Sequence, residues 1–345
     1  MNCKQLVTIA ATVASFCVAT TAHAYKVDDT LEIKAKLFAN WQTFEGDPNG
    51  GGFHLGRNYV EVRKHISDTD MVRVTLDQKG EADSTGTFVT VSGIPDTTGK
   101  AVTKNDGKIF VKYAYWQHTF PFSAKLKVGQ HHTPFVDYDN NDFWGYRFVA
   151  KAYTDEWGLQ TSSDSGVSLL GTAADKKVEY YFSVLNGEGY QHTVDGHGYA
   201  FAARVQANIN GIHAGVVTHD EGNRGGASNY DPTRRLVFAF FENDTFRVGG
   251  QYLVDADDGA GAKDFAKGTG YNVQGSVKLP FGNHASAFAR FDSVDKKDTG
   301  VDETLTIAGV SFEAAKGVTL APNMQIMDNG VDTNAVYGIN AQFKF

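Results

Sequence analysis

The sequence is poor in cysteine, in proline and in long apolar segments. Its 345 residues include only Cys3 and Cys17, together with 7 prolines. From residue 25 onward there is no thiol for a disulfide or a cysteine-bound metal. The one apolar stretch near the amino end, residues 6–18, is shorter than the roughly 20 residues that a spanning helix needs. These absences argue against a disulfide-rich domain and against a helical membrane protein.

The first 24 residues are typical of a secretory signal peptide. Lys4 provides a basic start, residues 6–18 form the apolar region, and Ala22-His23-Ala24 matches a small-x-small cleavage site. We predict cleavage after Ala24, which leaves residues 25–345. Lipidation at Cys17 is disfavoured because the bulky Phe16 precedes it.

The predicted mature chain is acidic. Removing residues 1–24 takes away one lysine and no acid, so 31 basic residues face 40 acidic ones and the net charge becomes −9. This balance argues against nucleic acid as a partner.

Alternating hydrophobicity dominates the mature chain. In residues 31–41 the odd positions run from Leu31 to Trp41, and the even positions include Glu32, Lys34 and Lys36. Side chains of a strand point alternately to two faces, so such a segment presents one apolar and one polar side. About sixteen similar segments recur, most of them close to the ~9–11 residues of a membrane-crossing strand. We place them at 31–42, 54–64, 71–79, 108–118, 124–132, 165–172, 177–186, 199–208, 212–219, 234–242, 246–255, 269–279, 284–294, 303–312, 317–327 and 334–345.

The connections between these segments alternate in length. Short turns such as Ser67-Asp68-Thr69 and Ile209-Asn210-Gly211 are separated by longer stretches such as 80–107 and 133–164. A soluble sandwich has no reason to place all its short turns at one end, whereas an outer-membrane barrel has short periplasmic turns and long external loops. The sequence therefore predicts an all-β fold, an antiparallel transmembrane barrel of about 16 strands over residues 25–345.

Aromatic residues support the same fold. They occur near strand ends or on faces predicted to meet lipid, where girdles of aromatics mark the two interfaces of a barrel. The residues expected there are Tyr113, Tyr115, Trp116, Tyr180, Phe182, Phe238, Phe240, Phe246, Tyr252, Tyr337, Phe343 and Phe345.

Several short motifs resemble the bacterial porins with sixteen strands. The terminal Tyr337-Gly338-Ile339-Asn340-Ala341-Gln342-Phe343-Lys344-Phe345 is similar to their membrane-insertion strand. Three internal segments, 57–62, 128–135 and 181–187, resemble the phosphate-selective (O/P-type) porin group. The resemblance implies a homotrimeric channel whose third external loop folds inward to narrow the pore. It does not by itself imply phosphate selectivity.

The connection 133–164 is the candidate constriction loop. It is long, and it combines aromatics with charged residues, a composition that favours packing on an inner wall over disorder. An external loop at the pore mouth or at the trimer axis is the alternative. Its charged candidates for the constriction are Asp137, Asp139, Asp142, Arg147 and Lys151.

The inward faces of the predicted strands are net basic. Charge is tolerated on a wet inner wall, whereas on the lipid face it costs about 2–4 kcal/mol per residue at mid-depth. A basic wall facing an acidic loop would create a transverse field that orients solutes and selects ions. The lining residues expected from parity are Lys34, Lys36, Arg57, Arg63, Arg73, Lys112 and Lys127.

Two short motifs could indicate a metal site, but both are weak signals. Residues 137–142 carry oxygen ligands at alternate positions but lack the sixth-position glycine and twelfth-position glutamate of an EF-hand, which leaves an irregular calcium site open. His131 and His132 are adjacent and would point to opposite faces of a strand, so a shared metal is disfavoured. We predict no cofactor and no metal site.

The predicted function is passive diffusion of ions and small hydrophilic solutes, with a slight lean to anions. Outer-membrane lipid, lipopolysaccharide and further copies of the chain are the expected partners. Two alternatives remain: a barrel enzyme such as a hydrolase, for which no nucleophile motif stands out, and a structural or adhesion barrel with a plugged lumen.

Overall fold

Sixteen strands close into an antiparallel barrel in the described part of the chain. The computed structural model describes residues 25–45, 51–79, 109–187, 189–191, 199–220, 233–257, 267–296 and 301–345, so the predicted signal peptide lies outside it. The predicted fold class and strand number are confirmed. The strands of the ring are β2 (Leu31–Phe44), β3 (Gly52–His65), β4 (Asp70–Lys79), β5 (Ile109–Thr119), β6 (Ala124–His132), β7 (Ser163–Ala173), β8 (Val178–Leu185), β9 (Ala200–Ile209), β10 (Ile212–Asp220), β11 (Thr233–Glu242), β12 (Phe246–Asp257), β13 (Lys267–Lys278), β14 (Ser286–Lys296), β15 (Val301–Ala315), β16 (Val318–Asp328) and β17 (Thr333–Lys344).

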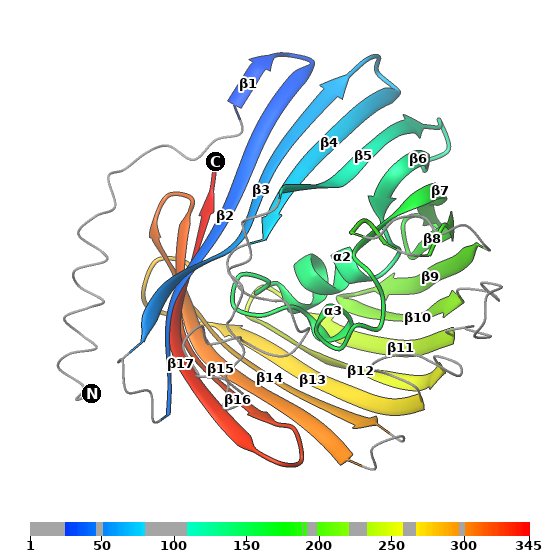
Figure 1. Ribbon diagram of the computed structural model, residues 1–345. Coiled ribbons are helices and arrows are strands. Elements are labelled where there is room, and N and C mark those ends of the chain that lie inside the picture. Colours follow the sequence, from blue (N-terminus) through cyan, green and yellow to red (C-terminus); the bar gives the residue numbers. More distant parts are fainter. Residues whose placement is uncertain are drawn as a thin grey trace.

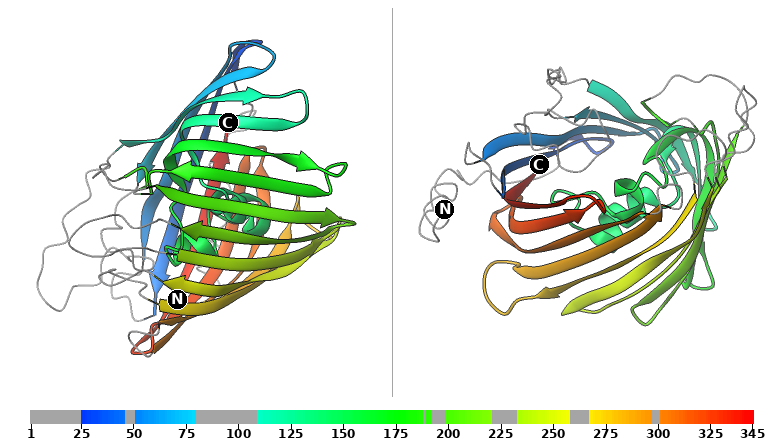
Figure 2. Two further views of the ribbon diagram at one scale, coloured as in Figure 1. Left: turned by 90° about the vertical axis from the view of Figure 1, so that its right-hand side faces the viewer. Right: turned by 60° about the horizontal axis from the view of Figure 1, so that its bottom comes forward.

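The last strand closes the ring on the first. β17 pairs antiparallel with β2, with Phe343 opposite Leu37 and Lys344 opposite Lys36, and it pairs on its other side with β16. Every neighbouring pair from β2 to β17 is antiparallel, and the ribbon views show the ring from several sides (Figures 1 and 2). Closure satisfies the backbone groups that an open sheet would leave at two edges.

One strand was not predicted. β1 (Tyr25–Asp28) forms a hairpin with β2 and lies outside the closed ring. Its turn is set by Asp28, whose Oδ1 accepts hydrogen bonds from the backbone N–H of Thr30 at 2.7 Å and from the Thr30 hydroxyl at 2.6 Å. Such an Asx turn is a local signal that the alternation pattern does not contain.

Short turns join the strands at one end of the barrel, which we call the short-turn end. One of the tightest is Asn210-Gly211 between β9 and β10, where both residues have positive φ, at 51° and 80°. A two-residue turn of this kind matches the twist of the flanking strands and favours Asn-Gly. Much of the predicted long connections, including 80–107, lies outside the described residues.

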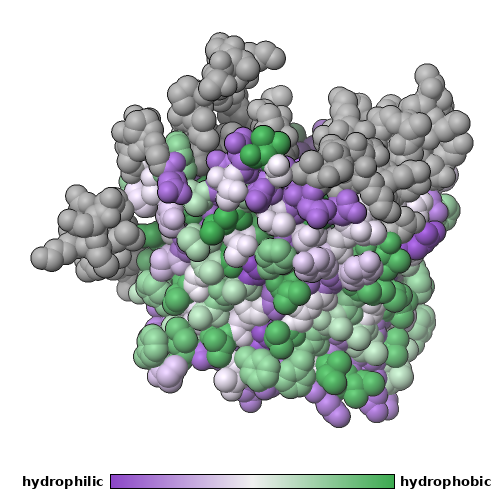
Figure 3. Space-filling model, turned by 90° about the horizontal axis from the view of Figure 1, so that it is seen from below, coloured by the Kyte–Doolittle hydropathy of each residue, from purple (hydrophilic) through white to green (hydrophobic). Residues whose placement is uncertain are grey.

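The two faces of the wall differ in chemistry. On β8, Phe182 and Val184 are exposed on the outside, whereas Tyr181 and Ser183 are buried inside. The same alternation on β13 exposes Tyr271 and buries Asn272. Hydrophobic residues cover much of the outer face (Figure 3). A barrel that is apolar outside and polar inside suits a lipid environment around an aqueous interior. No helix in the described ranges is long and apolar enough to cross a membrane.

Four of the predicted girdle aromatics face the interior instead. Tyr113 and Tyr115 of β5 are 4% and 5% exposed and contact His132, while Phe238 and Phe240 of β11 are 3% and 4% exposed. The prediction was wrong for these residues because inward aromatics fit this barrel, whose interior is partly filled by protein.

The filling segment is the inner loop, residues 133–162, which connects β6 to β7. It contains α2 (Val136–Tyr138), the short π-helix η1 (Asp139–Trp144) and α3 (Tyr153–Glu156), and it lies inside the ring of strands (Figure 1). Its two ends meet, because Thr133 Oγ1 donates to the carbonyl oxygen of Thr161 at 2.5 Å. The loop is therefore an excursion from an otherwise continuous β6–β7 hairpin.

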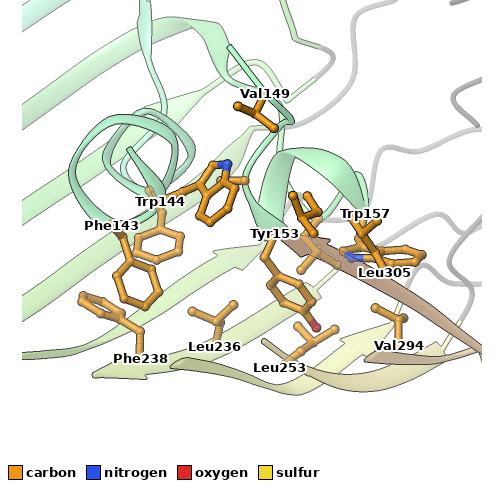
Figure 4. Packing of buried hydrophobic residues seen from close by; sticks show 14 of the residues in the cluster. Phe143, Trp144, Val149, Tyr153, Trp157, Leu236, Phe238, Leu253, Val294 and Leu305 are labelled. Carbon is orange, nitrogen blue, oxygen red and sulfur yellow. The ribbon is translucent and has the colours of Figure 1, made fainter. Parts of the chain in front are cut away.

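Aromatic side chains dock the inner loop on one wall. The rings of Phe143, Trp144, Tyr153 and Trp157 point toward aliphatic and aromatic residues of β11, β12, β14 and β15 (Figure 4). Phe143 lies 4.8 Å from Phe240 between ring centroids. Together these residues form a hydrophobic core inside the barrel, which holds the loop against the side formed by β11–β16.

Polar side chains of β14, β16 and β17 tether the inner loop. The Asn340 amide donates to the carbonyl oxygen of Phe148 at 2.9 Å, and the Gln325 amide donates to that of Val149 at 3.3 Å. Trp157 Nε1 donates to Asp292 at 3.0 Å, and Arg290 donates to the carbonyl of Lys151. Buried hydrogen bonds of this kind fix one position of the loop rather than a family of positions.

Candidate functional site

Two cavities lie between the inner loop and the wall formed by β2–β6. The first, of about 580 Å³, is bounded by β2–β5, by Asp137, Asn141 and Arg147 of the loop, and by the end of β17. The second, of about 450 Å³, is bounded by β3–β9 and by Asp142 of the loop. Both are lined by Arg63, Arg73, His132 and Asp137, which we call the junction. The two cavities therefore adjoin each other at these four residues beside the loop, and we call them together the passage.

Charges at the junction are closely coupled. Arg63 Nε lies 2.5 Å from Glu61, and Arg73 forms an ion pair with the same carboxylate. The Arg73 guanidinium also lies 4.7 Å from the centre of the Tyr113 ring and 3.2 Å from His132 Nε2. Two arginines therefore share one acid, so the wall side of the junction keeps a positive charge.

Asp137 faces this wall from the inner loop. Its carboxylate lies 3.4 Å from His132 Nε2 and accepts a hydrogen bond from the Asn141 side chain at 3.1 Å. At 42% exposure, its side chain reaches the open space. Opposite charges thus lie on the two sides of the junction, an arrangement that would produce a transverse field.

The first cavity contains further cations. Lys34 pairs with Glu32 at 2.8 Å, Lys36 lies directly opposite Lys344 across β2 and β17, and Lys112 Nζ lies 4.8 Å from the centre of the Tyr59 ring. Arg147 reaches the cavity from the loop and pairs with Asp155 at 3.3 Å. Burial opposes ionisation of Asp155, but the positive charges of Arg147, Lys151, Lys112 and Arg57 together lower its pKa to about 2.

The second cavity is more balanced in charge. Lys127 donates to the Tyr181 hydroxyl at 3.4 Å and lies 5.3 Å from the ring centres of Tyr115 and Tyr181. Arg204 lies 4.0 Å above the Tyr138 ring and 3.6 Å from Glu179. Asp142 faces these cations from the loop, and burial followed by the charge of Asp137 raises the pKa of the Asp142 carboxyl to about 6.

Three of the residues expected to line the pore lie outside both cavities: Arg57, Asp139 and Lys151. Arg57 pairs with Asp77 at 2.5 Å and lines neither cavity. Asp139 is fully buried, and its carboxylate accepts hydrogen bonds from Thr154 at 2.7 Å and from Gln251 at 2.6 Å, so it anchors the loop. Lys151 also lies outside both cavities. The other nine are at the passage: Lys34, Lys36, Arg63, Arg73, Lys112, Lys127, Asp137, Asp142 and Arg147.

The sequence interpretation missed the histidine at the junction. His132 stacks on Tyr113 with 3.9 Å between ring centroids, and both His131 and His132 contact the Tyr115 ring, so the two histidines do not diverge as predicted. β6 ends at His132, where the chain turns inward. Side chains alternate between the two faces only within a strand, so the alternation does not fix the direction of the last residue. The end of the predicted strand at His132 was the one signal in the sequence that could have shown this.

The calcium alternative finds no support in the geometry. Asp137 and Asp139 have separate hydrogen-bond partners, and no group of three or more His, Cys, Asp or Glu side chains in the described ranges is placed to hold a metal.

Lower pH is expected to shift ion preference toward anions. Asp142 is ionised at pH 7 and becomes neutral as the pH falls through about 6, which removes a negative charge from the second cavity. Reversal potentials in a salt gradient at pH 7 and pH 5 measure the shift. In Asp142→Asn the change in reversal potential between pH 7 and pH 5 should be smaller than in the wild type. An undiminished change in that variant would show that another group titrates.

Comparisons with known proteins support the fold. No protein-family model and no curated protein matches the sequence. Among solved structures, OprB of Pseudomonas putida has a TM-score of 0.69 at 9% identity, covering 92% of this chain and 94% of its own. The anion-selective porin of Comamonas acidovorans has a TM-score of 0.65 at 11% identity, with coverages of 92% and 99%. OmpT of Vibrio cholerae, an outer-membrane protein in its trimer form, has a TM-score of 0.61 at 15% identity, with coverages of 92% and 99%. The chain has the fold of the sixteen-stranded outer-membrane porins. The comparisons do not distinguish the phosphate-selective group.

Proposed function

We propose that this chain is an outer-membrane porin, a water-filled channel for passive diffusion of ions and small hydrophilic solutes. The observation that carries the proposal is the pair of charged cavities that meet at the junction inside a closed barrel with an apolar exterior. Neither a packed interior nor a row of catalytic groups would need such a passage. The inner loop is proposed as the constriction, because it occupies the lumen opposite β2–β6 and is held there by the β11–β17 side.

A slight preference for anions is part of the proposal. The first cavity is lined by seven basic side chains (Lys34, Lys36, Arg63, Arg73, Lys112, Arg147 and Lys344) and by two acidic ones, Glu61 and Asp137. The second has five basic and four acidic side chains: Arg63, Arg73, Lys125, Lys127 and Arg204 against Asp68, Asp70, Asp137 and Asp142. The charges that line a narrow cavity lie closer to a passing ion than the Debye length of roughly 8–10 Å, so salt screens them little.

Planar-bilayer recording of the purified protein tests both statements. We expect ohmic single-channel currents and, in a potassium chloride gradient, a reversal potential that favours chloride; replacing chloride by phosphate gives the phosphate permeability. Absence of conductance in correctly folded protein would refute the channel and favour a plugged structural barrel. A cation-selective reversal potential would refute the anion preference alone.

Assembly and export are the remaining parts of the proposal. We infer a homotrimer that contacts lipid and lipopolysaccharide, and a mature chain that begins at Tyr25. Native mass spectrometry of detergent-extracted protein measures both the number of copies and the mass of the processed chain. A monomer, or a chain that retains residues 1–24, would contradict the corresponding part.

A further inference from the structure

Lys112 occupies an unusual position in the first cavity. Register shifts by one residue within β5, since Tyr113 pairs with Thr75 while Val111 pairs with Leu76, and Lys112 is the extra residue of this bulge. Its ammonium group lies 4.8 Å from the Tyr59 ring centre and 5.5 Å from that of Tyr113. β-Bulges commonly redirect one side chain. Here the bulge leaves Lys112 and the next residue, Tyr113, both on the inner face, so the cation lies among tyrosine rings.

No acid of the described residues neutralises Lys112 directly. Within the described ranges, no carboxylate oxygen lies within the 4.0 Å ion-pair limit of its Nζ. The nearby acids have other cations: Asp77 pairs with Arg57, and Glu61 is shared by Arg63 and Arg73. Ring faces attract a cation but carry no net charge. The ammonium group can therefore still bind an anion that enters the cavity.

The surroundings of this cation are partly apolar. Phe38, Tyr59 and Tyr113 line the same cavity, and Phe38 meets Tyr59 edge to face with 5.9 Å between ring centroids. A cavity of about 580 Å³ has room for a molecule with one six-membered ring. Phosphate, which is small and strongly hydrated, would make no use of the ring surface.

We propose that the first cavity contains a binding site for ring-bearing monocarboxylates, with the carboxylate on Lys112 and the ring against Tyr59. The inference rests on the proposed channel function and names a solute class for it. Binding here would slow passage of such solutes and reduce the chloride current while they occupy the site.

Three probes separate charge from ring: benzoate, acetate, which keeps the carboxylate only, and benzamide, a neutral analogue that keeps the ring. Each is added to wild-type protein in a planar bilayer, and the half-blocking concentration of the chloride current is measured. We expect the half-blocking concentration of benzoate to be about tenfold lower than that of acetate, because ring contacts add to the attraction between the charges. Benzamide should block weakly.

Two variants locate the site. Lys112→Met removes the charge and should raise the half-blocking benzoate concentration about tenfold, the effect of losing one charge-assisted hydrogen bond. Tyr59→Leu removes the ring and should raise it about threefold while changing acetate little. Lys278→Met is the matched control, since this lysine lies at the short-turn end of β13 and lines neither the first nor the second cavity. Its effect should stay below twofold.

The outcomes separate the inference from the proposed function. A wild-type channel without conductance refutes both. A conducting channel in which acetate and benzoate block equally refutes the binding site and leaves the porin. Block by benzoate that Lys112→Met and Tyr59→Leu leave unchanged would also overturn the site. The wild-type comparison of three probes remains decisive if a variant fails to fold.

Discussion

Excision of the inner loop is expected to increase single-channel conductance severalfold. The loop occupies the lumen beside the passage, and its ends are joined by the Thr133–Thr161 hydrogen bond, so residues 134–160 can be replaced by a short Gly-Asn turn. The β6–β7 pairing continues from Gln130 opposite Ser165 to Ala124 opposite Gly171 and does not depend on the loop. Conductance in 1 M salt measures the widened passage, while circular dichroism and heat-modified gel migration show whether the barrel remains intact.

A charge variant provides the matched control. Excision removes bulk and also the charged residues of the loop, whereas Asp137→Asn/Asp142→Asn removes only the charge of the two loop acids that line the cavities. At 1 M salt the Debye length is about 3 Å, so this control should alter selectivity in dilute salt but leave conductance in concentrated salt nearly unchanged. Unchanged conductance in a folded, loop-excised barrel would show that current does not pass beside the loop.

Neutralising Arg73 is expected to lower the chloride-to-potassium permeability ratio roughly fifteenfold. At about 5 Å in water, a unit charge contributes about 0.8 kcal/mol, which is roughly fourfold for each ion and opposite in sign for the two. In Arg73→Gln, Glu61 keeps Arg63 as its partner, so the change is a net loss of one positive charge at the junction. Reversal potentials in a dilute salt gradient give the ratio.

The neighbouring Arg57 supplies the control for this prediction. It is an arginine on the adjacent strand, but Asp77 neutralises it and it lines neither cavity. Arg57→Gln/Asp77→Asn removes a neutral pair and should shift the permeability ratio less than twofold. If the permeability ratio changed more in this double variant than in Arg73→Gln, the selective region would lie near the Arg57–Asp77 pair rather than at the junction.

The strands were predictable because a membrane barrel imposes a strict period of two. On β6 the expected segment 124–132 has the observed bounds, and on β3 parity assigned Arg63 inward, next to the outward Val62. Each lipid-facing position must be apolar and each inward one can be polar, so the sequence carries this information residue by residue. Lys36 and Arg73 were placed at the passage for the same reason.

The site departs from the prediction where distant segments meet. The bulge at Lys112 moves Tyr113 and Tyr115 to the inner face, and a bulge depends on the partner strand rather than on local alternation. Phe238 lies on the inner face, where Phe135, over a hundred residues earlier, packs on it with 5.0 Å between ring centroids. Asp139 is buried because Thr154 and Gln251 satisfy its carboxylate. None of these contacts can be recognised from the alternation of apolar and polar residues in the sequence.

Thiol accessibility tests most directly the claim that ions pass between the inner loop and β2–β6. Residues 25–345 contain no cysteine, so a single thiol can be introduced at either of two adjacent residues of β3. Arg63 lines both cavities, whereas Val62 faces outward and is 36% exposed. A charged methanethiosulfonate reagent should sharply reduce the current of Arg63→Cys and leave that of Val62→Cys unchanged. Block of Val62→Cys alone, or of neither variant despite conducting channels, would contradict this path.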